Sequence, residues 1–176
     1  MVSCAKNIYL VGLMGAGKTT VGRQLAKRMG RRFIDTDHEI EARTGVRVGV
    51  IFELEGEAGF RQRESKLLAE LAHEPDLVLA TGGGAILKPE NRALMKDAGL
   101  VVYINVAPNV LFERVRHDRG RPLLQVPDPL AKLQELFAVR DPLYREAAHV
   151  VVDAAPGTVA QLLAKIETEI KTRCEP

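Results

Sequence analysis

The sequence predicts an α/β three-layer αβα sandwich built around a five-stranded parallel sheet. Five short apolar runs alternate with longer stretches that have the amphipathic spacing of helices. The apolar runs are continuous rather than alternating, as is typical of parallel strands that helices cover on both faces. A glycine-rich phosphate-binding pattern joins the first run to the first amphipathic stretch, which is the context that this pattern requires.

The elements follow from these two kinds of segment. The predicted strands are residues 8–11, 32–35, 77–80, 101–105 and 150–152, and the predicted helices are residues 18–29, 37–44, 57–71, 89–98, 109–116, 129–147 and 158–172. Gly30, Gly45 and Gly99 directly follow three of the helices, where helix-ending glycines are expected. The chain shows no internal repeat, low-complexity tract or linker, so we expect a single domain over residues 1–176.

Composition excludes several classes of protein. Apolar residues make up 46% and charged residues 27% of the 176 residues, as in folded globular domains, and the net charge of +2 is too small for nucleic-acid binding by overall charge. No apolar run approaches the roughly 20 residues that span a bilayer, and the first strand leaves no room for a signal peptide. Cys4 and Cys174 belong to no metal-binding pattern, and we expect no disulfide framework. We therefore expect a cytoplasmic monomer without nucleic-acid or membrane partners.

Residues 12–19 read Gly-Leu-Met-Gly-Ala-Gly-Lys-Thr and match the phosphate loop G-x-x-x-x-G-K-[ST]. The glycines let the backbone turn its N–H groups toward phosphate oxygens, Lys18 would lie between the β- and γ-phosphates, and the Thr19 hydroxyl would coordinate Mg²⁺. The strand and helix on either side argue against a chance match. The predicted ATP-binding residues here are Gly15, Ala16, Gly17, Lys18, Thr19 and Thr20. What the nucleotide is used for stays open at this point.

Two carboxylates follow the second predicted strand, at Asp35 and Asp37. Open α/β sheets bind ligands at the carboxyl ends of their strands, so both acids can reach the phosphate region. We assign Asp35 to the Mg²⁺ shell, through water, and Asp37 to the acceptor hydroxyl as a base or an orienting group. The alternative is that Thr36 or Asp37 only caps the next helix. Asp153, after the last strand, is an alternative ligand for the metal.

Six motifs, in this order, resemble the shikimate kinase family over about residues 8–152. They are the phosphate loop, Asp35-Thr36-Asp37, Gly59-Phe60-Arg61-x-x-Glu64, Gly82-Gly83-Gly84, Arg121-Pro122-Leu123-Leu124 and Arg140-x-Pro142-Leu143-Tyr144. The resemblance implies a fold like that of the nucleoside-monophosphate kinases, with sheet order 2-3-1-4-5. It also implies an ATP- and Mg²⁺-dependent kinase that phosphorylates the 3-hydroxyl of shikimate, on the route to chorismate and the aromatic amino acids.

The resemblance also implies roles for individual residues. The acceptor would be bound by Asp37, Arg61, Gly82, Gly83 and Arg140, with Phe52 and Phe60 as apolar walls; Arg114 would stack on adenine, and Arg121 would contact the phosphates from a lid. Catalysis would rest on Asp37, Lys18 and Arg121. The substrate-binding region would span about residues 37–64 and the lid about residues 117–129. One departure is Val50, where the family often has an acid.

Without the family resemblance, the residues alone leave alternatives to these roles. Arg61 and Arg140 carry guanidinium groups suited to a planar carboxylate, and Glu64, one helical turn from Arg61, could hold it in place. The alternative is a plain surface ion pair three residues apart, worth at most about a few tenths of a kcal/mol. The glycines after residues 77–80 indicate close backbone approach to a ligand, or an ordinary loop, with equal weight.

Two other functions compete with a kinase acting on shikimate. One is a kinase of the same fold with a different acceptor, such as gluconate or a nucleoside monophosphate. The chain has no Trp and only 5% aromatic residues, which argues against a cradle for a second base. The other is a nucleotide-gated binding module without catalysis, and the intact Lys18, Thr19, Asp35 and Asp37 argue against it.

Overall fold

The computed structural model describes residues 6–154 and 157–174, and its strands form one parallel sheet in the order β2-β3-β1-β4-β5. The strands are β1 (Asn7–Val11), β2 (Arg32–Asp35), β3 (Leu77–Ala80), β4 (Gly99–Asn105) and β5 (Val150–Asp153). The central strands β1, β3 and β4 are buried along almost their whole length, as their continuous apolar sequence predicts. The expected fold class and strand order are confirmed.

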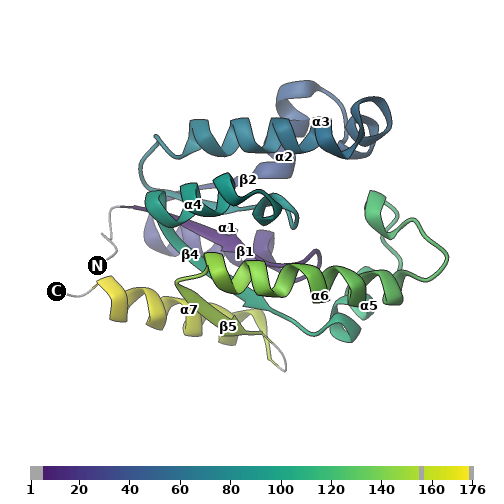
Figure 1. Cartoon of the computed structure of the whole chain (residues 1–176). Coiled ribbons are helices and arrows are strands. Elements are labelled where there is room, and N and C mark those ends of the chain that lie inside the picture. Colours follow the sequence, from purple (N-terminus) through teal and green to yellow (C-terminus); the bar gives the residue numbers. More distant parts are fainter. Residues whose placement is uncertain (1–5, 155–156, 175–176) are drawn as a thin grey trace.

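Helices cover the sheet on both faces. They are α1 (Lys18–Met29), α2 (Thr36–Thr44), α3 (Val48–Leu71), α4 (Pro89–Ala98), α5 (Pro108–Val115), α6 (Pro129–Ala147) and α7 (Val159–Cys174), with short 3₁₀ turns η1 (Ala85–Leu87) and η2 (Pro122–Leu124). Helices α1 and α7 pack together on one face, whereas α4 packs against α3 and α6 on the other (Figure 1). Right-handed crossovers in both directions from the centre of the sheet produce this arrangement.

Helix α3 is the largest departure from the predicted elements. It begins at Val48 rather than at residue 57, and it bends at Gly56, whose φ and ψ are 70° and 177°. Two glycines and several β-branched valines before residue 57 are poor helix formers, so local propensity does not predict a helix there. Packing against α2 stabilises the first part of α3, where local helix propensity is weak. The first part of α3 carries Phe52 into the site.

Two of the three helix-ending glycines behave as predicted. Gly30 and Gly45 adopt left-handed φ values of 65° and 74° at the ends of α1 and α2. Gly99 also follows its helix, α4, but its φ of −169° is extended and it is the first residue of β4. A side chain at Gly99 would collide with the carbonyl oxygen of Asn7 on the paired strand, so strand packing explains this glycine.

Cys174 is disulfide-bonded at the end of α7, a bond that the sequence, which predicts no disulfide framework, does not indicate. Cys4, the other cysteine of the chain, lies outside the described residues. The start of β1 and the end of α7 lie toward the same end of the molecule (Figure 1). Residue spacing along the chain cannot reveal such a proximity, because the fold creates it.

The phosphate loop and the predicted acidic residues lie at the opposite end of the sheet. The carboxyl ends of β1, β2 and β3 lead into the phosphate loop, the start of α2 and the turn at residues 81–84. The turn between α2 and α3 and the loop after α5 extend toward this same end (Figure 1). None of the helices in residues 6–154 and 157–174 combines the length and apolar character needed to cross a membrane.

Candidate active site

A cavity of about 480 Å³ opens at the carboxyl ends of the strands. Its walls come from the phosphate loop, the start of α2, helix α3, the turn after β3, the loop after α5 and helix α6. Among the residues predicted from the sequence, the cavity wall includes Gly15, Ala16, Gly17, Lys18, Thr19, Thr20, Asp35, Asp37, Phe52, Phe60, Arg61, Gly82, Gly83, Arg121 and Arg140. Arg114 is outside this wall, and its Nη1 donates to the carbonyl oxygen of Gly15 at 3.0 Å.

Lys18 closes the phosphate loop on itself. Its Nζ donates to the carbonyl oxygens of Gly12, at 2.5 Å, and Leu13, at 2.9 Å. Burial lowers the pKa of Lys18 to about 8, against the opposing attraction of Asp37 and Asp35. A phosphate anion in the loop would place a further negative charge beside this ammonium group.

Asp35 and Thr19 bring two oxygen ligands together beside the phosphate loop. The Thr19 hydroxyl donates to Oδ2 of Asp35 at 2.5 Å, while Oδ1 accepts from the backbone N–H of His38 at 3.1 Å. Asp35 is therefore the N-cap of α2, a role that the sequence left to Thr36 or Asp37. Hydroxyl and carboxylate oxygens suit Mg²⁺, which takes its other ligands from phosphate oxygens and water.

The alternative metal ligand Asp153 is used elsewhere. Its Oδ1 accepts from Nδ2 of Asn105 at 2.9 Å where β4 and β5 end, and it is not part of the cavity wall. The described residues also contain no cluster of three or more His, Cys, Asp or Glu side chains arranged to hold a metal. Thr19 and Asp35, unlike Asp153, lie in the cavity wall beside the phosphate loop.

Asp37 offers an unused acceptor in the cavity. It lies in the first turn of α2, and its Oδ1 is buried without a hydrogen-bond partner. Burial raises the pKa of Asp37, repulsion from Asp35 adds to the effect, and Lys18 and Arg61 oppose it. A buried oxygen of this kind gains most from a ligand that donates a hydrogen bond to it.

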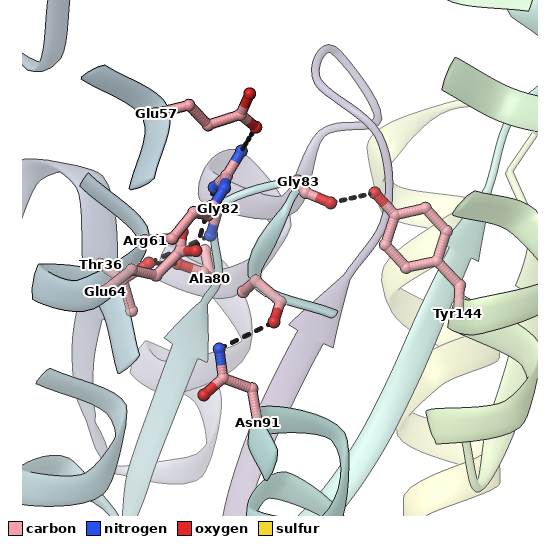
Figure 2. Close-up of polar contacts among 10 residues, drawn as sticks. Thr36, Glu57, Arg61, Glu64, Ala80, Gly82, Gly83, Asn91 and Tyr144 are labelled. Atoms are coloured by element: carbon pink, nitrogen blue, oxygen red, sulfur yellow. Dashed lines mark hydrogen bonds and ion pairs between the residues drawn. The ribbon is translucent and has the colours of Figure 1, made fainter. Parts of the chain in front are cut away.

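Arg61 is held by two carboxylates on its own helix, as Figure 2 shows. Its Nη1 donates to Oε1 of Glu64 at 3.0 Å, and its Nη2 donates to Oε1 of Glu57 at 3.2 Å. Arg61 is 8% exposed and Glu64 0%, so the alternative of a plain surface ion pair is wrong. Burial raises the pKa of Glu64 to about 7, although Arg61 attracts its negative charge. Glu57 was not foreseen; its spacing of four residues from Arg61 was the available signal.

The turn Gly82-Gly83-Gly84 approaches the charged groups of the site closely. A Cβ atom at Gly82 would lie 2.5 Å from Oε2 of Glu64 and 2.8 Å from Oδ1 of Asp37. A Cβ atom at Gly84 would overlap the guanidinium group of Arg61. Gly82 and Gly84 thus leave room for the protein's own charged side chains, whereas a Cβ atom at Gly83 would make only ordinary contacts.

Hydrogen bonds from outside the turn fix its backbone (Figure 2). The Thr36 hydroxyl accepts from the N–H of Gly82 at 3.1 Å and reaches the carbonyl oxygen of Ala80 at 3.4 Å. The Asn91 side chain donates to the carbonyl oxygen of Ala85 at 2.9 Å. The sequence predicts Thr36 only as a helix cap and contains no signal for Asn91, because both side chains act across distant segments.

The loop after α5 brings one arginine to the cavity. Arg121 lies in the cavity wall, its Nε bonds Oδ2 of Asp118 at 2.9 Å, and its charge is among those that lower the pKa of Lys18. Arg116 and His117, in contrast, are exposed and contact each other. Of the cluster of arginines in this loop, Arg121 is the one that reaches the phosphate region.

Fold and site together define a P-loop kinase with a small, charged acceptor pocket. A model of the family described as "Shikimate kinase" matches residues 14–171. This chain belongs to the shikimate kinase family, whose members are ATP-dependent kinases.

Known relatives agree with this assignment. The shikimate kinase of Dechloromonas aromatica is 63% identical over 162 residues, which cover 90% of this chain and 88% of that protein. The shikimate kinase of Aromatoleum aromaticum is 58% identical over 172 residues, covering 96% and 98%. Among solved structures, the shikimate kinase of Acinetobacter baumannii in complex with shikimate has a TM-score of 0.93 and 51% identity, covering 96% of this chain and 94% of that one.

Proposed function

We propose that this chain transfers the γ-phosphoryl group of ATP to the 3-hydroxyl of shikimate, giving shikimate 3-phosphate and ADP. The observation that carries the proposal is the unpartnered Oδ1 of Asp37, which lies in one cavity with Lys18, Arg61 and Arg140. This arrangement joins a phosphate site, an acceptor for a hydroxyl hydrogen and two cations for an organic acid. The similar Acinetobacter baumannii protein was solved in complex with shikimate, which supports the same acceptor here.

On the nucleotide side, the backbone of residues 15–20 would surround the phosphates, and Lys18 would move from its carbonyl partners to the β- and γ-phosphate oxygens. Thr19 and Asp35 would hold Mg²⁺, Asp35 through water. The ion would neutralise charge that develops on the phosphate oxygens. Arg114, which bonds the loop at Gly15, would line the adenine from its place on α5.

On the acceptor side, the guanidinium groups of Arg61 and Arg140 would bind the carboxylate, because both are nearly buried and their charges face the cavity. Phe52 and Phe60, with ring centroids 5.0 Å apart, would form an apolar wall for the ring of the acceptor. The backbone of Gly82 and Gly83 would approach its hydroxyls. Asp37 would accept the hydrogen of the reacting hydroxyl, as a base or an orienting group.

The remaining roles concern closure. Residues of about 117–129 would act as a lid, with Arg121 stabilising charge on the transferred group and the loop excluding water from it. Residues of about 37–64 would form the substrate-binding region within a single domain. The product would enter the route to chorismate and the aromatic amino acids.

A coupled assay of ADP release tests the proposal, with shikimate, gluconate and AMP offered as acceptors. We expect turnover with shikimate alone, and phosphorus NMR of the product should place the phosphate on the 3-hydroxyl. Turnover with gluconate or AMP but not with shikimate would assign the site to another small-molecule kinase. ATP binding without turnover on any acceptor would indicate a binding module.

A further inference from the structure

The hydroxyl of Tyr144 lies between two parts of the proposed acceptor site. Tyr144 is on α6, four residues after Arg140 and therefore on the same face of the helix. Its hydroxyl donates to the carbonyl oxygen of Gly83 at 2.5 Å, as Figure 2 shows. Nη1 of Arg140 lies beside the same glycine, 3.4 Å from where a Cβ atom of Gly83 would be. One hydroxyl thus connects the helix that carries the arginine with the glycine turn after β3.

The surroundings leave Tyr144 little freedom. Its side chain is 0% exposed, and its ring stacks on that of Tyr103 with centroids 4.8 Å apart and planes 28° from parallel. Tyr103 is itself fixed, because its hydroxyl donates to Oδ1 of Asp141 at 2.7 Å. The position of the Tyr144 hydroxyl is therefore set by the sheet and by α6 rather than by the turn that it contacts.

The hydroxyl of Tyr144 would fix the position of the Gly83 backbone. A Cβ atom at Gly83 would lie 3.4 Å from Nη1 of Arg140, 3.5 Å from the carbonyl oxygen of Gly12 and 3.6 Å from the Tyr144 hydroxyl. The turn thus fits between the start of the phosphate loop and α6. The N–H of Gly82 is fixed by Thr36, whereas the carbonyl of Gly83 is fixed by Tyr144.

We propose that the Tyr144 hydroxyl is a positioning residue of the acceptor site, which keeps the Arg140 guanidinium and the Gly83 backbone at one fixed separation. The acceptor then binds to two groups whose positions are already fixed. Binding therefore does not include the entropic cost of ordering them, and its free energy is more favourable. Tyr144 acts through Arg140 and Gly83 and does not itself need to touch the acceptor. The inference rests on the proposed function, because it concerns the site that would bind shikimate.

The test compares Tyr144→Phe with Tyr103→Phe in the full chain. Both substitutions keep the stacked rings and remove one hydroxyl from the same interface, but only the first hydroxyl contacts Gly83. We expect Tyr144→Phe to raise the KM for shikimate about fivefold to tenfold and to weaken shikimate binding in calorimetry by a similar factor. The KM for ATP should stay within about twofold in both variants, since the phosphate loop keeps its own hydrogen bonds.

Every outcome decides the inference. An unchanged KM for shikimate in Tyr144→Phe overturns it, and so does an equal rise for both substrates or an equal effect of Tyr103→Phe. A Tyr144→Phe chain that does not fold would assign the hydroxyl to stability and overturn it as well. Wild-type protein that neither binds nor phosphorylates shikimate would instead refute the proposed function, which separates the two failures.

Discussion

The carboxyl groups of Asp37 and Glu64 face each other across Gly82, and one oxygen of each is buried without a hydrogen-bond partner. Burial raises the pKa of both acids, and the charge of Asp37 raises the pKa of Glu64 further. The positive charges of Lys18 and Arg61 oppose these effects at Asp37. The acceptor site thus places buried negative and positive charges close together around Gly82, which has no side chain.

This geometry predicts that Gly82→Ala loses most of its activity. The added methyl group would lie within 3 Å of both carboxylates, so Asp37 or the turn must move. We expect kcat/KM for the acceptor to fall about 100-fold or more, as a displacement of about 1 Å can cause. Gly49→Ala is the control, because a Cβ atom at Gly49 meets nothing within 4 Å. Steady-state kinetics close to wild type for Gly82→Ala would contradict the role given to this turn.

Lys18→Met should lose turnover far more than stability. Its ammonium group bonds only two carbonyl oxygens of the phosphate loop, and neither bond belongs to the core. We expect kcat to fall by a factor on the order of 10² to 10³, as on loss of one group that stabilises the transition state. Thermal unfolding followed by circular dichroism should show a midpoint within a few degrees of the wild type, and a large drop would mean that the lysine is mainly structural.

Arg140→Ala should affect the organic acid and not the nucleotide. Loss of a hydrogen-bonded cation predicts a rise of about tenfold to 100-fold in the KM for shikimate and little change in the KM for ATP. Arg145→Ala is the matched control on the same helix, because Arg145 is exposed and pairs with Asp141. Equal effects of Arg140→Ala on both substrates would reject the role of Arg140 as a carboxylate clamp.

Glu64 predicts a dependence of stability on pH. Its pKa rises from 4.5 to about 7 on folding, so between these values the native chain holds a proton that the unfolded chain has lost. The contribution of Glu64 to the free energy of unfolding is complete below about pH 4.5 and is lost as the pH rises through about 7. The loss amounts to roughly 3 kcal/mol at most.

Urea unfolding at a series of pH values measures this contribution. The free energy of unfolding of wild type minus that of Glu64→Gln should fall between about pH 5 and pH 7.5. Glu57→Gln removes the exposed partner of the same arginine and should keep the pH dependence of the wild type. Parallel curves for wild type and Glu64→Gln would show that Glu64 does not titrate in this range.

Elements with strong local signals were predictable from the sequence. The apolar runs identified all the strands of the described chain to within one or two residues, and α1, α4 and α6 were predicted with the bounds that the structure has. The partnership of Arg61 with Glu64 was also foreseen, because three residues make one helical turn. In each case the decisive interaction lies within one element or between an element and its cap.

Contacts between distant segments were not predictable in this way. The hydrogen bond from Tyr144 to Gly83 joins residues 61 positions apart, and the bond from Gly82 to Thr36 joins residues 46 apart. Only the packed fold creates these pairs. The start of α3 at Val48 was missed for a related reason, since tertiary packing overrides weak helix propensity there.

The tyrosines of this chain have a spectroscopic consequence. The chain has three tyrosines and no tryptophan, and Tyr9, Tyr103 and Tyr144 are each at most 1% exposed. Burial raises the pKa of all three phenols above the ordinary value near 10. Near-ultraviolet absorbance and fluorescence therefore come from rings that water does not reach. Phenolate absorbance on alkaline titration would then record the opening of the fold, without any added dye.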